Sequence, residues 1–497
     1  MGSTRNSKSN DDVAVENVDY SSDNNVPAKQ DYPASLEGLN TDEYNKIRRR
    51  AVFKMDIQLL PTLVIMYILN FLDRQNIASA RLAGITTDLD LSQTQYQTCV
   101  SILFVGYILM QVPSNMMLAK IKYPGAYICS AMALWGVVSA TMGSVHSFAG
   151  LLITRFFIGF VEAVFFPGAL YFLSLFYNRK QYAFRAAILY SGSQLGNAFG
   201  GLFAIGILKL DGAHGIEGWR WLFIVEGVLT VGLAILFVFI LPNSPTSIRW
   251  LTKPEIDLLR HEYQLDQGQD DNASEITAKQ GFFMAVTDPK TWLLMATLYC
   301  IFISAAVTNF FPSVVATLGF SRNTTLGLTA PPYVLAIFVM TAIGFHSDRK
   351  QERYWHIICP LFVTLAANII AVSTTNTAAR YIAMMLMPPS FYSASTVLLS
   401  WITGSISQPA VKRASAIALI NATVNTPNIW TSYLYSGAPR YLVAFMVNLA
   451  AAAGAIVLAT ITMIYLRRVN KKLDEGKDTG KSGPTAAQRE AGFRYTL

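Results

Sequence analysis

The sequence predicts an all-α membrane protein in which twelve transmembrane helices form two six-helix halves. The first observation is composition, because 52% of the 497 residues are hydrophobic and only 14% are charged, whereas soluble proteins carry about 25% charged residues. The second is that apolar runs of about 20 residues, the length of a membrane-spanning helix, recur along the chain. The third is a polar segment at residues 242–289 that separates two sets of six runs. These features exclude a soluble protein.

The apolar runs define the expected helices in order. In the first half we place them at 57–79, 95–119, 124–145, 148–175, 183–208 and 219–241. In the second half we place them at 290–315, 325–346, 356–373, 380–404, 412–435 and 441–466. The polar remainder predicts a disordered tail at 1–50, a cytosolic linker at 242–289 and a second tail at 467–497, so that the two halves cover 51–241 and 290–466.

The charges between the runs orient the chain in the membrane. Basic residues concentrate in alternate connecting segments, including Arg48–Arg50, Lys120–Lys122 and Arg467–Arg468. Because basic loops remain on the cytosolic side, both termini are expected in the cytosol, with the plasma membrane as the expected location. The net charge of +8 then reflects topology, and nucleic acid is not an expected partner. Asn323 begins an Asn-Thr-Thr sequon in an outer loop and is the expected glycosylation acceptor.

Four charged residues fall inside two of the expected helices. Asp73 and Arg74 occur in the first helix, and Arg155 and Glu162 occur in the fourth. At 1.5 Å per residue, the Asp73–Arg74 pair and Arg155 are expected roughly 10 Å from the outer ends of their helices. Glu162 is expected two turns deeper, on the same face as Arg155. Charges at such depths are costly and indicate function by default.

The residue types indicate the chemistry of this layer. The guanidiniums of Arg74 and Arg155 match the two oxygens of a carboxylate, so both are candidate substrate-binding residues. Asp73 and Glu162 are candidate proton carriers, because burial favours the neutral acid while a neighbouring arginine favours the charged one. A substrate anion that occupies an arginine weakens its hold on the acid, which couples the anion to a proton.

Other interpretations apply to the remaining polar residues. In the structural alternative, the four charges are ion pairs that clamp the first and fourth helices. For Glu226 in the sixth helix a structural role is favoured, with Arg220 as its expected partner. Candidates for the uncharged part of a substrate cavity include Asn309, Tyr392 and Asn425, although polar residues also join membrane helices by hydrogen bonds.

Three segments, NFLDRQNIASARLAGI, RFFIGFVEAVFFPG and WRWLFIVEG, resemble the anion:cation symporter family of the major facilitator superfamily. The fungal branch of allantoate and nicotinate permeases is the most similar. The resemblance implies the superfamily fold and proton-coupled symport of organic anions. It also implies that Arg74 and Arg155 bind the substrate carboxylate, while Asp73 and Glu162 carry the coupling proton.

The resemblance further implies an inner gate after the eighth helix. The segment GFHSDRKQERY contains Gly344, Asp348 and Arg349 at the matching positions. The corresponding segment after the second helix, LAKIKYPGAY, lacks the acid. The gate is therefore expected to depend on the second copy.

These features predict a secondary active transporter that imports a small organic monocarboxylate, such as nicotinate or a related vitamin or ureide acid, with protons. Two alternatives stay open: an antiporter or uniporter that exports an organic acid or secondary metabolite, and a ligand-sensing receptor. An enzyme is not expected, because the sequence contains no metal-spaced histidine cluster, activated nucleophile or phosphate-binding loop. The expected partners are the anion, protons and lipid. No cofactor is expected besides the proton as coupling ion, and the chain is expected to be a monomer.

Overall fold

The computed structural model describes residues 35–36, 40–118, 121–177, 179–244, 248, 250–268, 277–406, 409–477, 479–480, 483–484, 488–489 and 492–497. Almost all of this part of the chain is helical, and no strand occurs in it. The predicted all-α class is therefore confirmed.

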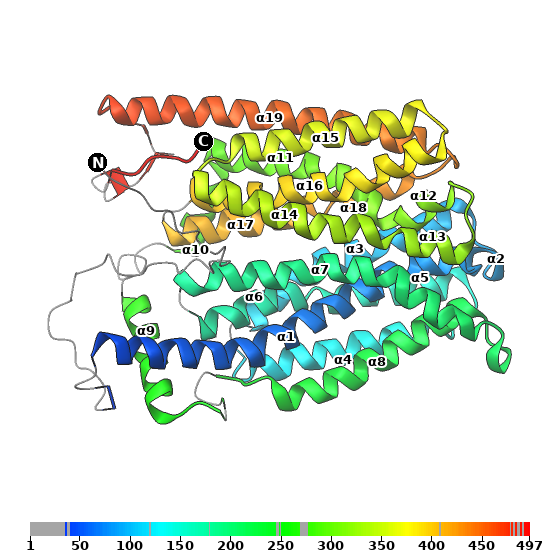
Figure 1. Cartoon of the computed structure of the whole chain (residues 1–497), viewed down its shortest axis with the longest axis horizontal. Helices are drawn as coiled ribbons and strands as arrows, with labels where there is room; N and C mark the ends of the chain where they lie inside the picture. The colour runs from blue at the N-terminus through cyan, green and yellow to red at the C-terminus, as the bar shows by residue number, and fades with distance from the viewer. Residues whose placement is uncertain are drawn as a thin grey trace, which may run out of the picture.

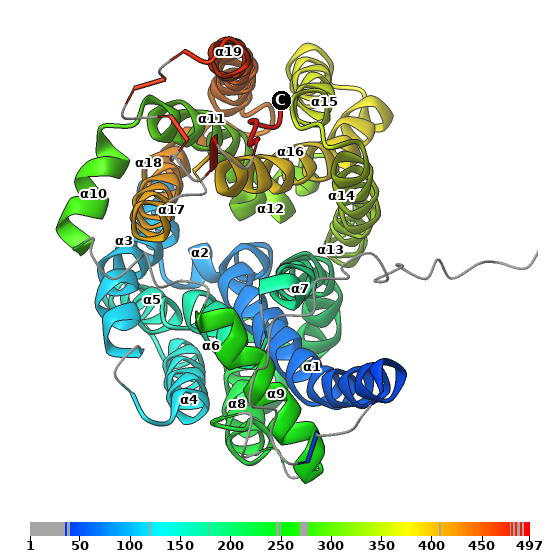
Figure 2. The ribbon, with the colours of Figure 1, turned by 90° about the vertical axis from the view of Figure 1, so that its left-hand side faces the viewer.

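The helices form two bundles that lie side by side (Figures 1 and 2). The first bundle contains α1 (Thr41–Leu82), α2 (Ile85–Asp88), α3 (Gln93–Leu118), α4 (Pro124–Met142), α5 (Phe148–Glu162), α6 (Phe165–Phe176), α7 (Arg179–Ile207), η1 (Leu208–Leu210), η2 (Ala213–Gly215) and α8 (Gly218–Ile240). The linker contains α9 (Lys253–Gly268) and α10 (Ala278–Val286). The second bundle contains α11 (Pro289–Ala305), η5 (Ala306–Phe310), α12 (Phe311–Ala316), α13 (Arg322–Leu328), α14 (Ala330–Lys350), α15 (Tyr354–Ser373), α16 (Thr377–Ser405), α17 (Ala410–Val424), α18 (Pro427–Trp430), η6 (Thr431–Leu434) and α19 (Leu442–Asp474).

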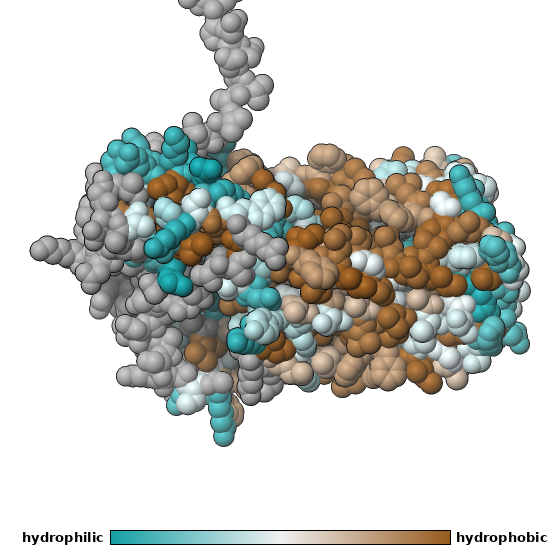
Figure 3. Space-filling model, turned by 90° about the horizontal axis from the view of Figure 1, so that it is seen from below, coloured by the Kyte–Doolittle hydropathy of each residue, from teal (hydrophilic) through white to brown (hydrophobic). Residues whose placement is uncertain are grey.

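The bundles have the dimensions and surface of a membrane protein. Within the described residues, nine helical segments are long and apolar enough to cross a membrane. The other three expected spans correspond to α3, α7 and the stretch from α17 to η6. Figure 3 shows an apolar band across the middle of the face in view and polar side chains toward both ends. This distribution suits helices whose sides face lipid, where every backbone polar group is satisfied within the helix.

The two ends of the molecule differ. The end where α1 begins and α19 ends is referred to as the terminal side, and the end that carries α2 and α13 as the opposite side (Figure 1). The linker helix α9 lies on the terminal side, against the start of α1, where Arg48 pairs with Glu262 at 2.7 Å. The linker helix α10 packs against α17.

The boundaries of two terminal helices differ from the prediction. Residues 41–50 were expected in a disordered tail but belong to α1, whereas residues 1–34 of that tail lie outside the described part. The early start has a local cause, because the Asn40 side chain accepts from the Glu43 amide at 2.8 Å while the Glu43 carboxylate accepts from the Asn40 amide at 3.2 Å. Such a capping box satisfies free N–H groups of the first turn. At the other end of the chain, α19 continues to Asp474, beyond the predicted boundary at 466.

Glycines allow helices of the first bundle to touch. A Cβ on Gly159 of α5 would lie 1.9 Å from the Leu103 carbonyl oxygen of α3, and a Cβ on Gly106 would lie 2.3 Å from the Phe156 oxygen. In α7, a Cβ on Gly196 would lie 2.6 Å from Phe71 Cβ of α1. The backbone contact of α3 with α5 holds the helix that carries Arg155 and Glu162 in a fixed position.

Contacts between the bundles close the opposite side. Gln93 of α3 donates to the Tyr435 carbonyl at 3.0 Å, and Ser101 donates to the Ile429 carbonyl at 2.8 Å. The hydroxyls of Thr98 and Tyr433 lie 3.1 Å apart. Each of these contacts joins α3 to the region that follows α17. These contacts hold the two halves together on the opposite side.

Three spans are broken near the middle of the bundles, and each break precedes a proline. α5 ends at Glu162 before Pro167, α11 gives way to η5 before Pro312, and α17 ends before Pro427. Proline has no N–H for the carbonyl one turn earlier, so the regular helix is interrupted there. Broken helices of this kind are tolerated in membranes where they are buried in protein or line a cavity.

Candidate functional site

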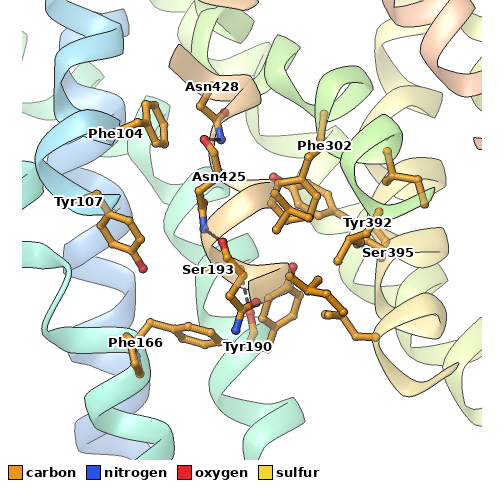
Figure 4. A pocket seen from close by; sticks show the side chains of 18 of the residues that line it. Phe104, Tyr107, Phe166, Tyr190, Ser193, Phe302, Tyr392, Ser395, Asn425 and Asn428 are labelled. Carbon is orange, nitrogen blue, oxygen red and sulfur yellow. Dashed lines mark hydrogen bonds between the residues drawn. The ribbon is translucent and has the colours of Figure 1, made fainter. Parts of the chain in front are cut away.

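A cavity of about 390 Å³ lies between the two halves. Its size falls within the range of small-molecule binding sites. Side chains of α1, α3, α6 and α7 line one wall, and side chains of α11, η5, α16, α17 and α18 line the other. Figure 4 shows Phe104 and Tyr107 of α3 across the cavity from Asn425 and Asn428. The lining continues to Thr403 near the terminal end of α16, so the cavity extends toward the terminal side.

Arg74 supplies the charge of this cavity. Among the described lining residues it alone is charged. Its Nε donates to Oε2 of Glu162 at 2.6 Å, and its guanidinium lies over the Tyr107 ring at 4.6 Å from the centroid. Glu162 itself is fully buried, and its Oε1 has no hydrogen-bond partner in the described part of the chain. The arginine therefore lies between an aqueous cavity and a buried acid.

Arg155 lies beside the cavity rather than in its wall. It is 2% exposed, and its Nε donates to the Cys99 carbonyl at 3.3 Å. It shares a small crevice with Arg74 and Asn309. The expected separation between an arginine layer and a deeper Glu162 is not observed, because the long Arg74 side chain reaches Glu162 directly. Arg155 Nη1 has no hydrogen-bond partner in the described part.

Asp73 points away from Arg74 and from the cavity. Its Oδ1 accepts from Ser139 of α4 at 2.6 Å, and its Oδ2 accepts from Thr230 of α8 at 3.4 Å. Asp73 therefore contacts α4 and α8, whereas Arg74 faces the cavity. The cause is helix geometry, since consecutive residues differ in direction by about 100° around an α-helix. Asp73 and Arg74 thus point to different faces of α1.

The second half contributes amides and a tyrosine. The candidate residues Asn309, Tyr392 and Asn425 all line the cavity. Asn309 Nδ2 donates to Asn428 Oδ1 at 2.8 Å, and Asn425 Nδ2 donates to the Asn421 carbonyl at 2.9 Å. Asn309 and Asn425 belong to the broken parts of their spans, where the irregular backbone turns side chains into the cavity.

Aromatic side chains form much of the remaining wall, and sequence reasoning did not assign them to it. They include Tyr67, Phe71, Phe104, Tyr107, Phe166, Tyr190, Phe302 and Phe391. Their spacing indicates a shared helix face, because Tyr67, Phe71 and Arg74 recur at helical intervals, as do Phe104, Tyr107 and Gln111.

A buried amide also belongs to the cavity wall. Asn197 of α7 lines the cavity, and neither of its side-chain polar atoms has a partner in the described part.

Glu226 does not pair with Arg220 as expected. The Arg220 guanidinium contacts the Glu217 carboxylate at 2.6 Å and donates to the carbonyls of Gly143 and Val145. Glu226 instead accepts from Asn76 of α1 at 2.8 Å. Arg220 and Glu226 lie more than one turn apart on α8, so the two side chains reach different neighbours.

The expected gate and glycosylation residues lie outside the cavity. Gly344, Asp348 and Arg349 belong to the terminal end of α14. The Asp348 carboxylate pairs with Arg353 rather than with a residue of the first half. Asn323 is exposed in the first turn of α13 on the opposite side. In the described part, no group of three or more His, Cys, Asp or Glu residues is arranged to hold a metal.

Comparison with known proteins places this architecture in a family. Residues 63–430 match the family model of the Major Facilitator Superfamily. An uncharacterised transporter of Schizosaccharomyces pombe is 30% identical over 94% of this chain and 93% of its own length. A high-affinity nicotinic acid transporter of Saccharomyces cerevisiae is 28% identical over 86% of this chain and 79% of its own length.

Solved structures agree with this assignment at the level of the fold. A bacterial homologue of the human lysosomal transporter Spinster, in an inward-facing conformation, superposes with a TM-score of 0.63 at 18% identity. The match covers 82% of this chain and 96% of that chain. The chain belongs to the major facilitator superfamily.

Proposed function

We propose that this membrane transporter carries a small organic anion together with protons by alternating access. The observation that supports this function is the position of Arg74, which is the charged residue of the cavity wall and is held by Glu162 at 2.6 Å. A guanidinium is suited to a carboxylate because its planar fork matches the two oxygens. The substrate carboxylate is expected to take the place of Glu162 on Arg74.

Charge balance then couples the anion to a proton. In the unloaded cavity the positive Arg74 and the negative Glu162 neutralise each other. When an anion binds Arg74, the displaced Glu162 carboxylate is left buried without its cation, which is costly in a low-dielectric site. A proton on Glu162 removes that cost. Release of the anion lets Arg74 recapture Glu162, and the proton leaves.

The walls of the cavity favour a flat monocarboxylate. The aromatic side chains offer faces on which a ring stacks, and the amides of Asn309 and Asn425 offer donors and acceptors to its polar atoms. The yeast relative is a high-affinity nicotinic acid transporter. Nicotinate or a related vitamin or ureide acid fits this chemistry. Arg155, close to Arg74 in the same crevice, adds positive potential for the anion.

The orientation in the membrane follows from the charges of the loops. With the terminal side in the cytosol, the seal on the opposite side faces outward and the cavity extends inward. The proposal places the chain as a monomer in the plasma membrane, with both termini in the cytosol and import as the direction of transport. Gly344, Asp348 and Arg349 are proposed to close the terminal side in the other state, and Asn323 is proposed as a glycosylation site on the outer face.

The test is uptake of radiolabelled anions by a yeast strain that lacks its own organic-anion uptake. A panel of monocarboxylates that includes nicotinate is measured over a range of external pH, with an empty vector as control. Uptake of at least one anion that rises as the external pH falls, and that collapses when a protonophore is added, is the expected result. Absence of pH-dependent uptake for the whole panel, with the protein at the cell surface, contradicts the proposal.

A further inference from the structure

Two buried carboxyl groups lie between α1 and α8, outside the cavity. Asp73 of α1 and Glu226 of α8 are 0% and 1% exposed. Thr230, one turn after Glu226, donates to Asp73 Oδ2 at 3.4 Å, and Asn76, one turn after Asp73, donates to Glu226 Oε2 at 2.8 Å, so the two acids lie about one turn apart on facing helices. Their hydrogen-bond partners are uncharged. Ser139 donates to Asp73 Oδ1 at 2.6 Å, and Asn76 donates to Glu226 Oε2 at 2.8 Å.

Neither carboxyl group has a cation beside it. Within the described residues, no ion pair includes Asp73 or Glu226, because Arg74 faces Glu162 and Arg220 faces Glu217. Besides the hydrogen-bond donors, Trp135 of α4 lies next to Asp73, and the further titratable group that acts on Asp73 is Glu162. The surroundings therefore contain acids and neutral groups from α1, α4, α5 and α8.

The helices leave little space for water or a cation at this level. A Cβ on Gly227, the residue after Glu226, would lie 2.5 Å from the Ala140 nitrogen and 2.6 Å from the Gly136 oxygen of α4. The backbones of α4 and α8 are therefore in contact beside the two acids. The two acids therefore lie beside a close helix contact and do not line the cavity.

Two negative charges in this position are strongly unfavourable. Each loses its hydration on burial, and the loss is not repaid by an ion pair. One proton held by either acid removes one of the two charges and the repulsion with it. Glu226 Oε1, which has no hydrogen-bond partner in the described part, is an oxygen on which that proton can reside.

We propose that Asp73 and Glu226 share one exchangeable proton, so that Glu226 is a proton-carrying residue of the transport cycle. The proposal rests on the proposed function and extends its proton pathway to α8. When this proton leaves a carboxyl oxygen, the pair gains one negative charge, and when a proton returns that charge is removed. Asp73 precedes Arg74 in α1, so the charge of the acid pair lies beside the residue on which the anion is expected to bind.

The first test observes the proton without any substrate. Purified protein in lipid is titrated from acidic to alkaline pH while infrared spectroscopy follows the carbonyl band of protonated carboxyl groups. Wild type is expected to lose band intensity as the pH rises, and E226Q is expected to lack that change. E217Q, a matched change at the exposed N-cap of the same helix, is expected to titrate like wild type. An E226Q titration identical to wild type overturns the shared proton.

The second test asks whether that proton takes part in coupling. With radiolabelled nicotinate as the probe, E226Q is expected to shift the pH of half-maximal uptake by about one unit or more, the size of effect that a neighbouring charge has on an acid. A pH profile equal to wild type overturns the coupling role, because a permanently protonated structural acid tolerates glutamine.

If E226Q fails to fold, E226D replaces it in both tests. A shifted titration and a shifted pH profile are then expected, and an unchanged titration and profile overturn the proposal. Lack of nicotinate uptake by wild type contradicts the proposed substrate alone, and the infrared titration still decides the shared proton.

Discussion

Arg74 and Glu162 are joined by a hydrogen-bonded ion pair of 2.6 Å that links α1 to α5 at the wall of the cavity. The arginine side chain is 17% exposed, whereas the glutamate side chain is 0% exposed. The cavity can therefore offer an anion access to one partner only. An incoming carboxylate competes for Arg74 and leaves Glu162 to be neutralised from elsewhere.

The first prediction concerns Glu162→Gln. Glutamine keeps the shape of the protonated acid but cannot release a proton, so accumulation against a gradient is expected to fall to background. Exchange of internal for external substrate is expected to persist, because it requires no net proton movement. Both are measured with radiolabelled substrate in membrane vesicles, as pH-driven uptake and as counterflow.

The control for this variant is Glu217→Gln, which makes the same chemical change at a half-exposed side chain of the opposite side. It is expected to accumulate substrate like wild type. Normal accumulation by Glu162→Gln would show that the coupling proton is carried elsewhere.

The second prediction concerns Arg74→Lys. Lysine keeps the positive charge but loses the planar fork and its contact with the Tyr107 ring. The apparent affinity for the substrate anion is expected to fall about tenfold, which corresponds to ~1.4 kcal/mol. Competition binding measures this affinity, with the exposed Arg440→Lys as the control that leaves it unchanged. An unchanged affinity in Arg74→Lys would remove Arg74 from the binding site.

The sequence predicts the fold more completely than it predicts the arrangement of the site. Span positions follow from hydropathy because each membrane helix needs an apolar run of fixed length, and these runs are unambiguous here. Side-chain direction does not follow in the same way. Asp73 and Arg74 are consecutive, and only the packing of α1 against α7 and α8 decides which of them faces Glu162. The Asn76–Glu226 contact joins residues 150 positions apart, and no local pattern indicates it.

The third prediction tests the close contact of α3 with α5. Gly159→Ala is expected to lower stability by about 1–3 kcal/mol, since overpacking forces backbone shifts of this cost and the added Cβ would lie 1.9 Å from the Leu103 oxygen. Thermal unfolding of the purified protein in detergent measures the change. Gly232→Ala of α8, where a Cβ meets nothing within 4 Å, is the control and is expected to be neutral or slightly stabilising. Equal unfolding temperatures for Gly159→Ala and wild type would contradict the close approach.

The fourth prediction concerns pH and the linker. Partial burial raises the pKa of the Glu255 carboxyl, but the Lys54 ammonium at 2.8 Å and the Thr252 amide hold its net pKa below the usual value. A lowered pKa means that the stabilisation is complete above the ordinary carboxyl value of about 4.3 and is lost as the pH falls through the lowered value. Glu255→Gln is expected to destabilise the contact of α9 with α1 by about 1–3 kcal/mol at neutral pH.

Limited proteolysis of the linker as a function of pH measures this contact. Glu255→Gln is expected to be cleaved more than wild type at neutral pH. This excess should vanish in acid, because the wild-type Glu255 is then protonated and as uncharged as the glutamine. Glu475→Gln, which affects an exposed ion pair of the other tail, is the control, because exposed pairs contribute little. A constant excess at every pH would exclude Glu255 as the titrating group.

The fifth prediction concerns the docked segment 493–497 on the terminal side of the second half. Tyr495 is 5% exposed; its backbone amide donates to Asn470 Oδ1 at 2.9 Å, and its hydroxyl accepts from Lys290 Nζ at 3.2 Å. Trp401 donates to the Thr496 carbonyl at 2.8 Å, so the segment joins α11, α16 and α19. Tyr495→Ala is expected to cost about 3–5 kcal/mol, as for other large buried aromatics, whereas Tyr495→Phe keeps the ring and should cost about 1 kcal/mol. Thermal unfolding separates the two variants, and equal stability of Tyr495→Ala and wild type would show that the segment does not hold these helices together.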